Sequence, residues 1–530
     1  MNEVNTRRNF IKQIGWGTAG LIVAPSLLSA FPASTKRVNN LPRSTPEAQG
    51  VSSEALSKLF DAMDASEIDF HSIMVMRNGF VIGEGWWAPY APQYKHSLYS
   101  LSKSFTSCAV GLAINEGHFT VEDNVTKFFP DLLPAQLSPN LAAMKVKHLL
   151  TMNTGHKTAP NLSGANWAKT FLDTPVEAEP GTNYVYNTSA TYMLSAIITK
   201  TTGKTMLEFL TPRILQPLNI EGADWEVSPQ GINSGGVGLR VRTEDIASFS
   251  QLYLNKGKWN GKQLIPASWV EASSKSYWDF KTNPFGGSSP KEKDDWQQGY
   301  GYQFWRTKHN GYRSDGLYGQ FGVILPDENL VVAITEESFK TQQTLDFVWD
   351  ILLPGLTKDK LPANSAALAT LKSKEDGLKV NFPAGQSSSA LVGTISGKKF
   401  MLEANTLGAK AVTFDISNSN CALTVHYDNG ERKLNYGFCK WELAKNGRVM
   451  YKQLPFPVPG LPDVSTEVAG MATWKDANTL YLVDRPVETV NSDSLTITFD
   501  GNSVKLVLLN SVVEARKQKD PRPELTGKIA

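Results

Sequence analysis

The sequence predicts an α+β fold, an antiparallel sheet flanked by helices with a helical insertion, followed by a separate all-β, barrel-like domain. Two observations lead to this prediction. Strand-like hairpins lie at both ends of the segment 42–356, whose middle is mainly helical in pattern, and short alternating runs fill the chain beyond it. We therefore expect one α+β domain at 42–356, a linker with one helix at 357–384 and an all-β domain at 385–530.

Residues 1–33 have the features of an export signal. Arg7 and Arg8 precede a short apolar stretch that ends in small residues, as in twin-arginine signals. The stretch is interrupted by glycine and proline and is shorter than the roughly 20 apolar residues of a membrane span. We expect cleavage near residues 30–34, a periplasmic or secreted protein and no stable membrane anchor. An uncleaved amphipathic helix is the alternative.

Within the α+β domain, the spacing of apolar residues predicts each element in turn. We expect helices at 52–63, 100–117 and 340–356, and hairpins at 71–86 and 320–338. The first hairpin turns at Arg77-Asn78-Gly79 and the second at Pro326-Asp327-Glu328-Asn329. Strands at both ends of a helical segment favour an antiparallel sheet over the strand–helix alternation of a doubly wound fold.

The charge and the cysteine and histidine content argue against several classes of function. Lys and Arg number 53 against 51 Asp and Glu, and basic residues form no tract beyond the N-terminus, which argues against a nucleic-acid partner. The three cysteines and seven histidines form no CxxC, HxH or HExxH pattern, so no metal site is predicted. Cys421 and Cys439 lie on either side of the turn 428–430. A disulfide and two buried thiols are both compatible with this spacing.

Ser100 and Lys103 form an SxxK pattern at the start of a predicted helix. The same pattern occurs at Ser288 and Ser396, but Pro290 interrupts the first of these and glycines bound the second. Residues i and i+3 of a helix share a face, and a partly desolvated lysine loses its proton more easily and can activate a hydroxyl. The alternative is that Ser100 caps the helix and Lys103 is solvated.

Two further stretches follow in order along the chain. Residues 179–205 reach Tyr186 and then an apolar helical pattern, and residues 311–335 place a glycine-containing turn before a strand. Together with Ser100 and Lys103, they resemble the active-site elements of serine β-lactamase and penicillin-binding-protein-like hydrolases, especially the class C β-lactamase and esterase branch. The resemblance covers 42–356 and implies a β-lactamase-like fold. It is supported by the stretches HLLTMNTGH, 231–270 and QGYGYQFW.

The resemblance implies a role for each of these residues. Ser100 would be the acylated nucleophile, Lys103 its proton partner, and Tyr186 a general base and then the acid for the leaving group. The oxyanion hole would consist of the backbone N–H groups of Ser100 and Leu317. The substrate would be a small ester or amide, and no cofactor or metal is implied. The all-β domain resembles lipocalin-like barrels appended to some members of the family, without an assigned ligand.

The sequence departs from the family pattern at two places. The family's Tyr-x-Asn is replaced by Tyr186-Asn187-Thr188, so contact with the substrate amide falls to Thr188, or to Asn187 if the loop shifts. The Lys-Thr-Gly or His-x-Gly element is replaced by Ser314-Asp315-Gly316. Asp315 and Gly316 are still expected at the substrate site, but an acid there should repel a substrate carboxylate.

These observations predict an exported serine hydrolase of the esterase, amidase or D-amino-acid peptidase type. A true β-lactamase and a non-catalytic penicillin-binding-like protein remain the alternatives. An α/β-hydrolase is disfavoured because the chain has no GxSxG sequence and the predicted strand order differs. The oligomeric state stays open.

Overall fold

The computed structural model describes residues 41–444 and 467–530, so the predicted export signal lies outside the described residues. The α+β part is built on a six-stranded antiparallel sheet in the order β2-β1-β11-β10-β9-β8. The strands are β1 (Asp69–Arg77), β2 (Phe80–Trp86), β8 (Trp305–Arg306), β9 (Tyr312–Gly316), β10 (Gln320–Leu325) and β11 (Leu330–Glu337). The predicted antiparallel sheet is confirmed, with strands from both ends of the segment paired at its centre.

The turns of the two predicted hairpins lie where the sequence places them. β1 and β2 are joined by Asn78 and Gly79, whose φ angles of 53° and 84° are the left-handed values that a tight hairpin turn requires. Asn-Gly is the pair that adopts these values most readily, which explains why this turn could be read from the sequence.

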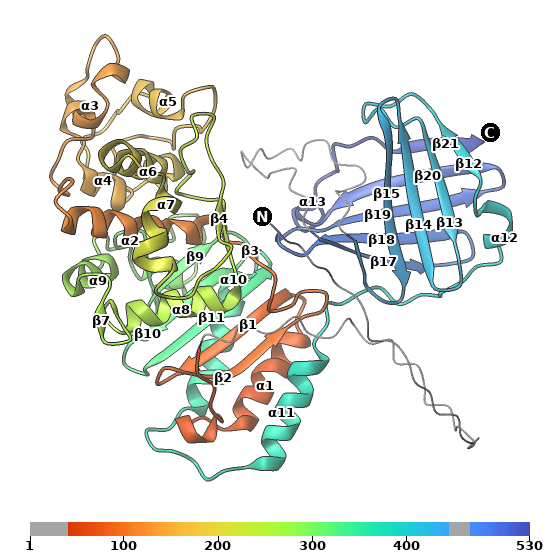
Figure 1. Ribbon diagram of the computed structural model, residues 1–530, viewed down its shortest axis with the longest axis horizontal. Helices are drawn as coiled ribbons and strands as arrows, with labels where there is room; N and C mark the ends of the chain where they lie inside the picture. The colour runs from red at the N-terminus through yellow and green to blue at the C-terminus, as the bar shows by residue number, and fades with distance from the viewer. Residues whose placement is uncertain (1–40, 445–466) are drawn as a thin grey trace, which may run out of the picture. The chain divides into compact units, whose positions relative to one another are not determined.

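Helices cover both faces of the sheet because its strands alternate apolar side chains between two cores. Ile73 and Val75 belong to the core formed with α1 (Ser53–Asp64) and α11 (Ser365–Gly377), whereas Met74 and Met76 belong to the other core. Helix α8 (Thr243–Leu254) packs on that second face, and α10 (Thr341–Phe347) lies with α1. Figure 1 shows α1 and α11 side by side.

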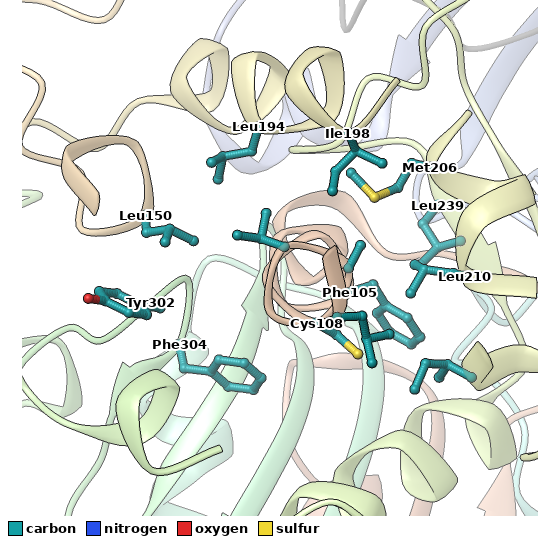
Figure 2. Packing of buried hydrophobic residues seen from close by; sticks show 14 of the residues in the cluster. Phe105, Cys108, Leu150, Leu194, Ile198, Met206, Leu210, Leu239, Tyr302 and Phe304 are labelled. Carbon is teal, nitrogen blue, oxygen red and sulfur yellow. The ribbon is translucent and has the colours of Figure 1, made fainter. Parts of the chain in front are cut away.

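The helical insertion surrounds α2 (Ser102–Asn115), the helix that carries Lys103. Its other helices are α3 (Pro139–Ala143), α4 (Val146–Leu150), α5 (Trp167–Asp173), α6 (Thr188–Thr202), α7 (Met206–Leu210) and α9 (Ala267–Ser274). Figure 2 shows Phe105 and Cys108 of α2 packed among apolar side chains from several elements, including Leu194 and Ile198 of α6. Every residue of α2 from Ser102 to Ala113 is buried, so the core fixes this helix on all sides.

The C-terminal part is a closed antiparallel sheet. Its ten strands, counted within the described residues, run in the order β15-β14-β13-β12-β21-β20-β19-β18-β17-β16, and a short parallel pairing of β15 with β17 closes it. They are β12 (Lys399–Leu402), β13 (Ala411–Ile416), β14 (Asn420–Tyr427), β15 (Gly430–Phe438), β16 (Glu442–Ala444), β17 (Val468–Trp474), β18 (Thr479–Pro486), β19 (Asp493–Asp500), β20 (Ser503–Asn510) and β21 (Leu525–Ile529). The separate barrel-like domain is therefore confirmed.

Side chains pack together in the barrel core. Phe414 and Phe499 contact each other edge to face at 5.4 Å between ring centroids, and Phe400 and Trp474 pack against Phe499. All four side chains are buried. The two short helices α12 (Val392–Ile395) and α13 (Ser511–Ala515) accompany these strands.

The two cysteines of this part are free thiols. Cys421 is buried in β14, and Cys439 is exposed immediately after β15. The predicted hairpin is present, but neither alternative holds in full: the two thiols form no disulfide, and only Cys421 is buried. In the described ranges, no helix combines the length and apolar character needed to cross a membrane.

Candidate active site

Ser100 lies in a tight turn that leads into α2. The sequence predicted that Ser100 begins the α-helix, but the residues Tyr99–Leu101 form a 3₁₀ turn and α2 begins at Ser102. Tyr99 has a φ of 47°, a left-handed backbone value that is uncommon for residues other than glycine. The chain thus turns sharply at the residue before Ser100, a feature that helical periodicity does not reveal.

Lys103 is 1% exposed, which excludes the alternative of a solvated first-turn lysine. Its Nζ donates hydrogen bonds to Oγ of Ser100 at 2.9 Å, to Oγ1 of Thr188 at 3.1 Å and to the carbonyl oxygen of Gly236 at 2.8 Å. Burial lowers the pKa of Lys103 to about 7, although the negative charge of Asp315 opposes this shift. Near neutral pH, Lys103 therefore exchanges between two forms: the ammonium donates all three hydrogen bonds, and the uncharged amine donates two and can accept a proton from Oγ of Ser100.

Tyr186 completes the group around Ser100. The Tyr186 ring stacks on Trp305 with 5.9 Å between the two ring centroids. Nζ of Lys103 lies 4.9 Å from the centroid of the Tyr186 ring. Burial raises the pKa of Tyr186, an effect that a side-chain hydrogen bond with Ser100 opposes. The phenol is thus protonated at neutral pH, in the state that can donate a proton.

Helix α6 positions Thr188 but directs Asn187 elsewhere. Asn187 is the N-cap of α6, where its Oδ1 accepts a hydrogen bond from the backbone N–H of Ala190 at 3.0 Å. Its side chain is fully buried. Of the two residues proposed to contact the substrate amide, the structure brings Thr188 to Lys103 and gives Asn187 a capping role.

Two glycines allow backbone segments to approach Lys103 and the turn that carries Ser100. A Cβ atom on Gly236 would lie 2.8 Å from Cγ2 of Thr188, so only glycine lets this carbonyl reach Lys103. A Cβ atom on Gly316 would lie 2.2 Å from the carbonyl oxygen of Leu98, just ahead of the turn that carries Ser100. Sequence reasoning missed Gly236, and the Gly235-Gly236 pair was the signal available for it.

Ser100 opens into a pocket of about 590 Å³. Tyr186, Asp315, Gly316 and Leu317 line it, so the predicted residues from three distant stretches meet there. Aromatic side chains form much of the remaining wall: Phe285, Trp296, Trp305, Tyr318 and Phe339. This wall could not be read from the sequence, because it combines residues from separate loops. Within the described ranges, no group of three or more His, Cys, Asp or Glu side chains is placed to hold a metal ion.

Asp315 forms a buried ion pair with Arg313. Nε of Arg313 donates to Oδ2 of Asp315 at 2.9 Å, and the Arg313 side chain is fully buried. Burial raises the pKa of Asp315 to about 6, although the charge of Arg313 opposes that shift. Arg313 therefore neutralises part of the charge on Asp315.

Comparison with known proteins gives one family. The family model described as Beta-lactamase matches residues 57–350. The 6-aminohexanoate-dimer hydrolase of Paenarthrobacter ureafaciens is 25% identical over 219 residues, covering 38% of this chain and 56% of that protein. The Beta-lactamase of Escherichia coli strain K12 is 24% identical over 214 residues, covering 36% and 55%. The chain thus spans about half the length of these relatives.

A solved penicillin-binding protein homologue from Caulobacter crescentus shows a structural likeness. It is 14% identical, its alignment covers 57% of this chain and 97% of that one, and the TM-score is 0.47.

Proposed function

Because this chain belongs to the Beta-lactamase family, we propose that it is a serine hydrolase that cleaves an ester or amide through an acyl-enzyme on Ser100. The observation that carries the proposal is the hydrogen bond of 2.9 Å between the buried amine of Lys103 and Oγ of Ser100. A hydroxyl attacks a carbonyl poorly unless a neighbouring base takes its proton. Lys103, with a pKa lowered to about 7, is that base.

In the first half of the reaction, Oγ of Ser100 attacks the substrate carbonyl carbon and its proton passes to Nζ of Lys103. The negative charge that develops on the carbonyl oxygen is stabilised by the backbone N–H groups of Ser100 and Leu317. Tyr186, which stays protonated because burial raises its pKa, donates a proton to the departing oxygen or nitrogen. The bond to the leaving group breaks, and the acyl group remains on Ser100.

In the second half, water attacks the acyl carbon and releases the acid. The proton of the water passes to the Tyr186–Lys103 pair, and Oγ of Ser100 recovers its proton. Lys103 keeps its position through the reaction because Thr188 and the carbonyl of Gly236 also accept its hydrogen bonds. The lowered pKa of Lys103 and the raised pKa of Tyr186 support a base role for Lys103 and an acid role for Tyr186 in the first half.

Asp315 argues for substrates without a carboxylate next to the third element. Asp315 lines the pocket, and a carboxylate on the substrate would meet a like charge in a partly desolvated site. We therefore propose that neutral esters or amides are better substrates than penicillins and cephalosporins. We also propose that the protein acts in the periplasm or outside the cell, on the strength of the sequence of residues 1–33.

The proposal is tested by measuring kcat/KM for a p-nitrophenyl ester, a chromogenic cephalosporin and a D-alanyl peptide. We expect kcat/KM for the ester to exceed kcat/KM for the cephalosporin by more than tenfold, because Asp315 should repel the cephalosporin carboxylate. A factor of about ten corresponds to a difference of 1.4 kcal/mol in free energy. Ser100→Ala should abolish turnover, whereas Ser288→Ala should not, although Ser288 carries the same SxxK pattern. Turnover that survives in Ser100→Ala would refute the mechanism.

A further inference from the structure

One carboxylate oxygen beside Ser100 has no protein hydrogen-bond partner among the described residues. Oδ2 of Asp315 accepts from Arg313, whereas Oδ1 receives no hydrogen bond from residues 41–444 or 467–530. The Asp315 side chain is 12% exposed and lines the same pocket as Ser100. Because Oδ1 is not fully buried and Asp315 lines the pocket, this oxygen is open to a ligand that brings a hydrogen-bond donor or a positive charge.

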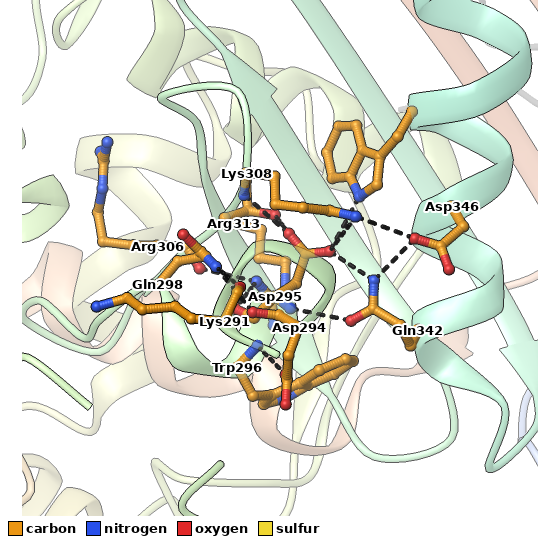
Figure 3. A network of polar contacts seen from close by, with 12 residues as sticks. Lys291, Asp294, Asp295, Trp296, Gln298, Arg306, Lys308, Arg313, Gln342 and Asp346 are labelled. Atoms are coloured by element: carbon orange, nitrogen blue, oxygen red, sulfur yellow. Dashed lines mark hydrogen bonds and ion pairs between the residues drawn. The ribbon is translucent and has the colours of Figure 1, made fainter. Parts of the chain in front are cut away.

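Arg313 cannot move into the pocket to serve as that partner. Its Nη1 donates to the carbonyl oxygens of Asp295 and Arg306, at 3.1 and 2.9 Å, and its guanidinium lies 4.6 Å from the ring centroid of Trp296. Figure 3 shows the polar network around Asp295 that holds this segment. The Asp295 carboxylate accepts hydrogen bonds from Thr307, the backbone N–H of Lys308, Gln342 and Trp349.

The walls near Asp315 suit an organic cation. Phe285 meets the rings of Tyr186 and Trp305 at 5.4 and 5.5 Å between centroids, and the latter two rings stack on each other. Aromatic faces attract ammonium groups, and the attraction grows when the cation is desolvated. A hydrated metal ion would instead need several oxygen ligands, which these walls do not supply.

The other charged groups of the pocket leave Asp315 as the acceptor for such a cation. Lys293 and Lys340 lie at the exposed rim, and Lys340 forms an ion pair with Glu67. Asp294 also lines the pocket, but its carboxylate already accepts hydrogen bonds from Asn283, Gln297 and the backbone N–H of Trp296. Lys103 is engaged at Ser100.

From this arrangement we infer that the enzyme acts on esters or amides that carry a compact organic ammonium group, bound by Oδ1 of Asp315 and the aromatic wall beside the scissile carbonyl. The inference rests on the proposed function, because it names the substrate class of the same site. It predicts that kcat/KM is higher for cationic substrates than for neutral ones, and higher for neutral substrates than for anionic ones.

Two pairs of esters of matched shape test the inference at pH 8. The first pair is acetylcholine and 3,3-dimethylbutyl acetate, with the cation in the leaving group. The second pair is the p-nitrophenyl esters of 4-(trimethylammonio)butanoate and 5,5-dimethylhexanoate, with the cation in the acyl group. We expect kcat/KM to favour the cationic member at least tenfold in one pair. Asp315→Asn should reduce that ratio to within about threefold of unity, and Asp279→Asn, which removes an exposed carboxylate outside the pocket, should not.

A ratio close to unity in both pairs would overturn the inference, and so would a preference that survives in Asp315→Asn. If neither pair is hydrolysed and Ser100 resists acylation, the proposed function fails and this inference fails with it. If the neutral esters are hydrolysed without a preference, only this inference fails. If the Asp315→Asn variant does not fold, the inference is tested by comparing two competitive inhibitors of the unaltered enzyme. Tetramethylammonium should bind at least tenfold more tightly than tert-butanol, and equal binding would overturn the inference.

Discussion

In the proposed mechanism, the reactivity of Ser100 depends on the charge of the Lys103 amine. Lys103 accepts the Ser100 proton only when it is neutral, and burial sets its pKa to about 7. We predict that kcat/KM for a neutral ester rises as the pH increases through about 7 and is lost below it, where Lys103 is protonated. The plateau should extend past pH 10, the ordinary pKa of tyrosine, because burial raises the pKa of Tyr186.

A pH–rate profile of the unaltered enzyme and of Asp315→Asn checks this prediction. The negative charge of Asp315 raises the pKa of Lys103, so removing it should move the rising limb to lower pH. A profile without a rise near neutrality, or a limb that moves to higher pH in Asp315→Asn, would contradict the assignment of Lys103 as the base.

At the residue scale, the sequence identified the residues that family resemblance marks and missed those that only the fold brings together. Ser100, Lys103 and Tyr186 stand in stretches with recognisable order. Gly236 accepts from Lys103 through its backbone carbonyl, which side-chain patterns do not reveal. Asn187 was a candidate for substrate contact only if the loop shifts relative to the family's Tyr-x-Asn, and the structure places it as the N-cap of α6.

At the scale of elements, the proposed site depends on how closely β9 approaches the turn Tyr99–Leu101 that carries Ser100. We predict that Gly316→Ala lowers kcat/KM by about 10²-fold, because a Cβ atom 2.2 Å from the carbonyl oxygen of Leu98 forces the two segments apart. The matched control is Gly377→Ala at the end of α11. An added Cβ there meets no atom within 4 Å apart from its chain neighbours and the backbone of its own helix.

Both variants should be compared by kcat/KM and by thermal unfolding. Gly377→Ala should retain normal activity, and Gly316→Ala should remain folded. Normal activity in a folded Gly316→Ala variant would show that the position of β9 relative to Ser100 is not critical.

The elements themselves were predictable where local chemistry determines them. The Asn78-Gly79 turn and the hairpins follow from residue preferences and alternation. The 3₁₀ turn at Tyr99–Leu101 was not predicted, because its left-handed residue is a tyrosine rather than a glycine and nothing local requires that conformation.

For the whole molecule, the sequence predicted the two architectures but not how the barrel closes. Alternating runs indicate strands, yet the parallel pairing of Gly437 with Met471 joins strands that are not neighbours in sequence. Such a pairing leaves no local signal. The helix expected in 357–384 is α11, and its Leu371 is buried in the core that contains α1.

The location of the whole protein is a separate prediction from its sequence. We expect replacement of Arg7 and Arg8 by lysine to retain the protein in the cytoplasm, because twin-arginine signals are read by a receptor that recognises the guanidinium pair. Cell fractionation of the two forms, with activity as the readout, measures this. Equal export of both forms would indicate another route.

The central claim is that Ser100 is the residue that becomes acylated, and trapping the covalent adduct tests it most directly. The protein is treated with a fluorophosphonate at pH 8, and intact mass followed by peptide mapping locates the label. We predict one label on Ser100, none in Ser100→Ala, and labelling at least 10²-fold slower in Lys103→Ala, because the hydroxyl then lacks its base. A label on another serine, or a Ser100→Ala variant that is labelled at the normal rate, would contradict the account.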